Sequence, residues 1–158
     1  MSSNKLTIFP DLNKFKNITV LNISNNKITG DIITDNYKEI SCKSNNITSV
    51  KSNRLKKLDA SNNKIANINI PCVEIMYINE NKLNNIDDYK NLKYLECIGN
   101  NISKITGMNN LKELYASNNN LATIDNLNEL EILNCIDNPI KMINFFPKLK
   151  MMIVSTKN

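Results

Sequence analysis

Residues 92–105 of the chain read LKYLECIGNNISKI, and residues 111–124 read LKELYASNNNLATI. Residues 130–143, LEILNCIDNPIKMI, follow the same pattern. Apolar residues and one asparagine hold fixed places in each stretch, LxxLxLxxNxL, with a further apolar residue three positions on. A fixed period of this kind is typical of structural repeats that stack on their neighbours, and it outranks any element-by-element interpretation.

The asparagine of this pattern recurs at intervals of 18 or 19 residues. Each copy lies five residues after one apolar residue and two before another. The earlier repeats accept small substitutions, such as Tyr37 for the first leucine and Cys42 or Ala60 for the third. The seven positions, which we call the asparagine ladder, are Asn26, Asn45, Asn63, Asn81, Asn100, Asn119 and Asn138.

Each part of the repeat has a physical reason. The L-x-L portion alternates with period two, so it predicts a short strand with two inward side chains, and stacked repeats pair these strands into one parallel sheet. The asparagine lies where the chain turns away from the sheet, and its amide both donates to and accepts from the turning backbone. We therefore interpret the ladder as structural, since buried polar groups are normally satisfied internally.

The pattern resembles the leucine-rich repeat. Among its subclasses, the isoleucine-rich unit is similar to internalin-like and protein phosphatase 1 regulatory subunit-like repeats, although those units are somewhat longer. The resemblance implies a solenoid with a parallel concave sheet and a non-enzymatic role in protein binding. The segment after each asparagine is too short for a full helix, so we expect extended or 3₁₀ structure on the convex side. Its interior should be filled by Ile105, Met108, Ile124, Leu127, Ile143 and Phe146.

One domain accounts for the whole chain of 158 residues. We expect an N-terminal cap or degenerate repeat at 1–16, seven repeats at 17–148 and a truncated terminal repeat at 149–158. A degenerate first strand is expected at Leu6–Ile8, with Leu12 and Phe15 packed behind it. The abundance of asparagine, lysine and isoleucine is typical of an AT-rich genome, and short repeats of this kind are similar to proteins of large AT-rich DNA viruses, protists and bacteria.

The composition argues against catalysis. The chain has no histidine, the commonest general base and metal ligand. Asp87 and Asp88 form a paired carboxylate, which we interpret as a solvated turn. The sequence thus predicts no enzyme activity, no cofactor and no metal site.

The cysteines and the N-terminus both point to the same compartment. Cys42, Cys97 and Cys135 share the second inward strand position and should be buried fillers, while Cys72 has no obvious partner. All four are expected to be reduced thiols. We find no transmembrane run and no signal segment in the sequence, so we expect a cytoplasmic, reducing environment and no membrane contact.

The strand positions expected to face outward become apolar from the fourth repeat onward. We call these seven residues the concave patch: Ile75, Tyr77, Tyr94, Ile98, Tyr115, Ile132 and Ile136. A contiguous exposed apolar patch usually marks an interaction site, and tyrosine suits that role. Ordinary strand surface is the alternative, because β-forming residues are favoured at such positions in any sheet.

Two further partners stay open on the sequence alone. The net charge of +5 and a lysine-rich N-terminal half would suit weak nucleic-acid binding, but Arg54 is the one arginine among 20 basic residues, and nucleic-acid readers rely on arginine. The lysine-rich half contains Lys38, Lys43, Lys51, Lys56, Lys57 and Lys64. The last strand needs a cap: either Ile143, Phe145, Phe146 and Pro147 fold around that end, or it pairs with a second molecule. A homodimer or self-associating scaffold could form through this edge or through the concave patch.

Overall fold

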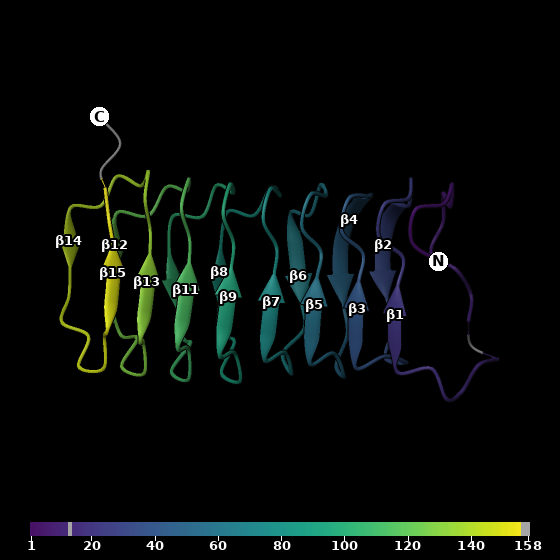
Figure 1. Ribbon diagram of the computed structural model, residues 1–158, viewed down its shortest axis with the longest axis horizontal. Helices are drawn as coiled ribbons and strands as arrows, with labels where there is room; N and C mark the ends of the chain where they lie inside the picture. Colours follow the sequence, from purple (N-terminus) through teal and green to yellow (C-terminus); the bar gives the residue numbers. More distant parts are fainter. Residues whose placement is uncertain (13, 156–158) are drawn as a thin grey trace.

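The computed structural model describes residues 1–12 and 14–155, and these form a single solenoid (Figure 1). Its main sheet has eight parallel strands that follow one another in chain order. This is the face that the repeat pattern predicts to be concave, and we call it the concave sheet, although its strands run in a nearly straight row in Figure 1. The strands are β1 (Val20–Asn22), β3 (Glu39–Ser41), β5 (Lys57–Asp59), β7 (Ile75–Tyr77), β9 (Tyr94–Glu96), β11 (Glu113–Tyr115), β13 (Ile132–Asn134) and β15 (Met151–Ile153).

The opposite side of the solenoid is also extended, as expected, and carries short parallel strands. These strands form one sheet of three and two sheets of two. They are β2 (Thr29–Ile33), β4 (Asn46–Lys51), β6 (Asn67–Asn69), β8 (Ile86–Asp87), β10 (Ile105–Thr106), β12 (Thr123–Ile124) and β14 (Met142–Ile143). Within the described residues there is no helix, and buried side chains from both sides fill the space between them.

The register of the concave sheet is the same at every step. The central apolar residue of each strand pairs with its counterpart in the next repeat, as Leu95 does with Met76 and with Leu114. Middle residues of β1 to β13 are buried, whereas the residues on either side point outward. Successive repeats therefore superimpose their outward side chains in straight columns along the stack.

The core is a continuous aliphatic column between the two sides. It includes five of the six residues expected to fill the convex interior, and the sixth, Ile143, is half-buried against them. Cys42, Cys97 and Cys135 are fully buried and free. Cys72 is also free, and it is half-buried.

The N-terminal segment differs from the expectation. Leu6–Ile8 is not a strand of the concave sheet. Instead the carbonyls of Leu6 and Thr7 accept from the backbone N–H groups of Lys27 and Thr29, on the far side of the asparagine turn. Leu12 packs against the core, but Ile8 and Phe15 are 73% and 60% exposed. The spacing of Leu6 and Ile8 is typical of a strand. The backbone bonds to Lys27 and Thr29 instead place this segment after the turn at its own N-terminal end.

Candidate functional site

The asparagine ladder holds the turns of the solenoid together by one repeated set of bonds. Asn100 illustrates it: Nδ2 donates to the carbonyl of Cys97 in its own repeat, at 3.1 Å, and to that of Ile78 in the preceding repeat, at 3.0 Å. Its Oδ1 accepts from the N–H of Leu83 in the preceding repeat, at 3.1 Å. The same three contacts recur at the other six ladder positions. The side-chain amides of the ladder thus form their hydrogen bonds with the backbone of the solenoid.

An eighth asparagine, Asn4, belongs to the same ladder. Its Nδ2 donates to the carbonyl of Met1, three residues earlier, and that carbonyl also accepts from Asn26. Ser3 precedes it with φ +56°, the left-handed conformation found before every ladder asparagine. Sequence reasoning missed Asn4 because 22 residues separate it from Asn26 and no strand motif precedes it. The one available signal was the pair of apolar residues at Leu6 and Ile8.

The concave patch lies on β7 to β13 and the turns that follow them. All seven of its residues are half-buried, and its three tyrosines form a row along the stack. Ring centroids are 5.0 Å apart between Tyr77 and Tyr94, and 5.6 Å apart between Tyr94 and Tyr115. The structure therefore brings the tyrosines of three successive repeats into one aromatic surface.

Two glutamates lie among these rings. Tyr94 Oη donates to Glu96 Oε2 at 2.9 Å, and Tyr115 Oη donates to Glu113 Oε2 at 3.2 Å. Glu96 also accepts from Asn79 Nδ2 at 2.6 Å. Burial, followed by the hydrogen bond to Glu96, raises the pKa of Tyr94, and burial followed by Glu113 raises the pKa of Tyr115. The repeat pattern gave no signal for these bonds to the tyrosines, because they depend on side-chain rotamers.

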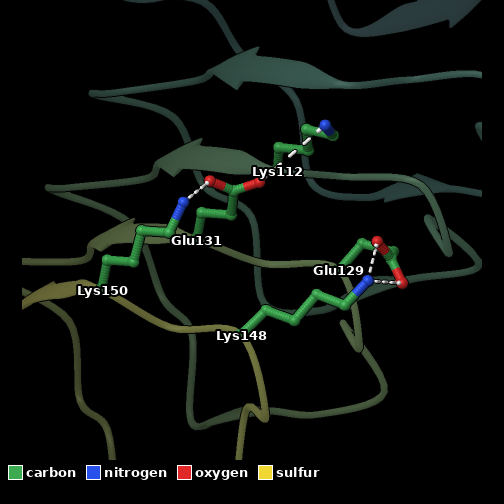
Figure 2. Close-up of polar contacts among 5 residues, drawn as sticks. All are labelled: Lys112, Glu129, Glu131, Lys148 and Lys150. Atoms are coloured by element: carbon green, nitrogen blue, oxygen red, sulfur yellow. Dashed lines mark hydrogen bonds and ion pairs between the residues drawn. The ribbon is translucent and has the colours of Figure 1, made fainter.

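A separate column of charged side chains runs along the concave sheet where the strands begin. Its members lie one residue before the strands β5 to β15. Glu74 lies between Lys56, at 3.2 Å, and Lys93, at 2.8 Å. Glu131 likewise lies between Lys112, at 3.8 Å, and Lys150, at 2.6 Å (Figure 2). Figure 2 also shows Lys148 paired with Glu129 at 2.6 Å.

These pairs lower the pKa of both bridging carboxyls. For Glu74 the main cause is the hydrogen bond from Lys93, and for Glu131 it is the one from Lys150. Their partners are well exposed, so each pair contributes little to stability. Their main effect is to neutralise part of the lysine charge along this edge.

The lysine-rich N-terminal half presents its charge over several surfaces. Lys43 and Lys57 lie on the concave side, whereas Lys51 ends β4 on the opposite side. Lys56 is occupied by Glu74. On the concave side this half has a shallow hollow of about 370 Å³, lined by both signs of charge, including Glu39, Lys57 and Asp59.

Apolar side chains are also exposed at the last strand. Met151, Met152 and Ile153 of β15 are 51%, 53% and 42% exposed, although Met152 holds the place that Leu133 fills in the repeat before. Phe145 nearby is 85% exposed, and Phe146 is buried. Of the segment expected to fold around this end, Phe146 thus joins the core while Phe145 does not. The final residues of the expected terminal repeat, 156–158, lie outside the described part of the chain.

Other candidate chemistry is sparse. Asp87 ends strand β8 and does not lie in a turn as expected, and it accepts from Thr106 Oγ1 at 2.8 Å. Asp88, which follows the strand, is exposed with φ +63°. No cluster of metal-ligating side chains occurs in residues 1–12 and 14–155. Over the same residues, no helix is long and apolar enough to cross a membrane.

Comparisons with known proteins agree with this geometry. A leucine-rich repeat family model matches residues 17–36. The solved structure of a leucine-rich repeat protein of Leptospira interrogans superposes with a TM-score of 0.70 at 23% identity, covering 98% of this chain and 53% of that one. The chain folds as a leucine-rich repeat protein.

A second solved leucine-rich repeat structure is more distant. YopM from Yersinia enterocolitica gives a TM-score of 0.46 at 17% identity, over 98% of this chain and 49% of YopM. The chain spans about half the length of these two solved structures. No curated protein sequence matches it.

Proposed function

We propose that the chain is a non-enzymatic protein-interaction module that binds a protein partner on its concave sheet, mainly over the C-terminal half. The observation that carries this proposal is the row of three tyrosines, Tyr77, Tyr94 and Tyr115, in contact across β7 to β11. Aromatic side chains with an apolar body and a polar tip are the residues that dominate protein interfaces. Isoleucines beside the row extend its apolar area. The free, buried cysteines fit a reducing, cytoplasmic setting.

The test replaces two tyrosines with serine. The double variant Tyr94→Ser, Tyr115→Ser should lose capture of the partner from a lysate of the source cell, detected by mass spectrometry. The control, Glu39→Ser with Lys57→Ser, changes the first outward residue of β3 and of β5, the position that Tyr94 holds in β9, and should retain capture. Circular dichroism and urea unfolding establish that each variant is folded. Capture that survives in the tyrosine variant would refute the proposal.

A second candidate function is self-association through β15, as a homodimer or a scaffold. It is favoured by the exposed Met151, Met152 and Ile153 at the edge of the concave sheet. An edge strand with apolar side chains is a template for pairing with another chain. Light scattering over a range of concentrations should show a mass above the monomer, reduced by Met152→Lys. Val20→Lys, on the opposite edge strand β1, is the control, and a monomeric mass at every concentration would exclude this function.

A further inference from the structure

Tyrosine and glutamate alternate in a two-by-two arrangement on β9 and β11. Tyr94 is the register partner of Glu113, and Glu96 is the register partner of Tyr115. All four side chains are half-buried on the outward side of the sheet. Each tyrosine hydroxyl donates to the glutamate of its own strand, so the two strands present the same unit in opposite order.

Among residues 1–12 and 14–155, no lysine or arginine forms an ion pair with either carboxylate. Every ion pair found in the described residues joins a lysine to Glu74, Glu129 or Glu131. The outward positions of β7, β9, β11 and β13 contain no lysine or arginine. This part of the sheet is therefore negative on a protein whose net charge is +5.

Glu96 and Glu113 also keep capacity for further donors. Each carboxylate oxygen has about two acceptor sites. Glu96 uses one on each oxygen, for Asn79 and Tyr94, and Glu113 accepts from Tyr115. Both oxygens of each glutamate can thus accept another N–H group. Burial first, and then the hydrogen bond from the Tyr94 hydroxyl to Glu96, raise the pKa of Tyr94.

The tyrosine rings complete the surroundings that a cation needs. A cation within about 6 Å of an aromatic centroid is attracted to the ring face. Both glutamates accept from tyrosines of this row, whose ring centroids are 5.0 and 5.6 Å apart. Arginine suits such a surface better than lysine, because its planar guanidinium stacks on rings and donates in a fork to carboxylates.

We propose that Glu96, Glu113 and the tyrosine row bind a basic side chain, arginine foremost, that the protein partner inserts between flanking apolar contacts. This inference rests on the proposed function, because it specifies what the partner presents to the same face. Ile75 and Ile132, the register neighbours of Tyr94 and Glu113, would receive those apolar contacts.

The experiment selects binders from a random-peptide display library on the purified protein. Enriched peptides should share an arginine or lysine beside apolar residues. Replacing that residue with uncharged citrulline or norleucine should weaken binding roughly tenfold or more, and Glu96→Gln with Glu113→Gln in the protein should do the same. The control Glu39→Gln removes one carboxylate charge from the outward side of β3 and should leave the affinity for the peptides unchanged. Higher salt should weaken the wild-type complex.

The outcomes separate the two proposals. One outcome is a set of peptides that depend on Tyr94 and Tyr115 but share no basic residue, or that bind the double glutamine variant equally well. This outcome refutes the binding of a basic side chain and leaves the proposed function intact. A selection with no binder that depends on Tyr94 and Tyr115 overturns both. Glutamine at 96 keeps one acceptor oxygen, for Asn79, and its amide nitrogen can donate to the Tyr94 hydroxyl instead of accepting from it. The variant is therefore expected to fold, and an unchanged urea midpoint checks this.

Discussion

Replacing Asn119 with alanine tests the role of the asparagine ladder most directly. Asn119 is 1% exposed, and its Oδ1 accepts from the N–H of Ile102 at 2.9 Å. Its Nδ2 donates to the carbonyls of Cys97, Ala116 and Ser117 at 2.9, 3.1 and 3.2 Å. Alanine removes all four contacts from the interior of the stack.

The four lost hydrogen bonds do not cost the same free energy. The carbonyl of Cys97 also accepts from Asn100, and that of Ala116 also accepts from Asn138, so both keep a donor. The N–H of Ile102 keeps no partner within the described residues. An orphaned buried donor costs about 1–3 kcal/mol, and each lost bond with a surviving partner costs less, so the free energy of unfolding should fall by about 3 kcal/mol.

Urea unfolding followed by circular dichroism measures this change. With a slope of about 2–3 kcal/mol per molar urea, the midpoint should fall by about 1 M while the slope stays constant. The matched control is Asn120→Ala, because Asn120 is exposed and its side chain makes no bond found in the structure. Its effect should stay within about 0.5 kcal/mol. Equal stability of the two variants would refute the structural interpretation of the ladder.

Three further predictions concern groups outside the ladder. Tyr89→Phe removes the bond from Oη to the Ile68 carbonyl, 2.9 Å long, and should lower the free energy of unfolding by about 1 kcal/mol in the same assay; an unchanged midpoint would count against it. Burial raises the pKa of Tyr89 to about 12 and also raises that of Tyr94, so above pH ~10 the unfolded chain loses these protons first. The folded state then binds more protons, and the urea midpoint should fall as pH rises from about 10 towards 12; a constant midpoint would contradict this. Burial raises the pKa of Cys97 to about 12, so a thiol reagent should label half-buried Cys72 well before Cys97, and simultaneous labelling would disagree with the fold.

The sequence predicted the repeat architecture because its signal is redundant. Each strand, turn and asparagine is specified seven times over, so a substitution such as Cys42 or Met76 does not obscure the frame. The same periodicity predicted which strand residues face outward. It also predicted an extended opposite side, because too few residues remain there for a helix.

Single occurrences were harder to predict. The first turn, at Asn4, lies 22 residues before Asn26 and lacks the strand motif, so a periodic template passes over it. Leu6 and Ile8 alternate as a strand would, but the carbonyls of Leu6 and Thr7, which accept from the N–H groups of Lys27 and Thr29, determine where the segment lies. The repeat motif does not include these residues, so it does not predict where they lie.

The candidate site was predicted only as a set of positions. Columns of outward residues placed Tyr77, Tyr94 and Tyr115 on one face. Their ring contacts and hydrogen bonds to Glu96 and Glu113 depend on side-chain rotamers, which the repeat pattern does not specify.

The constant interval between strand and ladder asparagine separates two kinds of sequence change. Five residues always lead from the central strand residue to the asparagine, as from Leu95 to Asn100, whereas the return to the next strand varies in length. A residue gained or lost on that return path leaves the spacing between outward columns at the strand separation of about 4.8 Å. Insertions and deletions can thus accumulate on one side of the molecule during its evolution, while the side that would recognise a partner changes only by substitution.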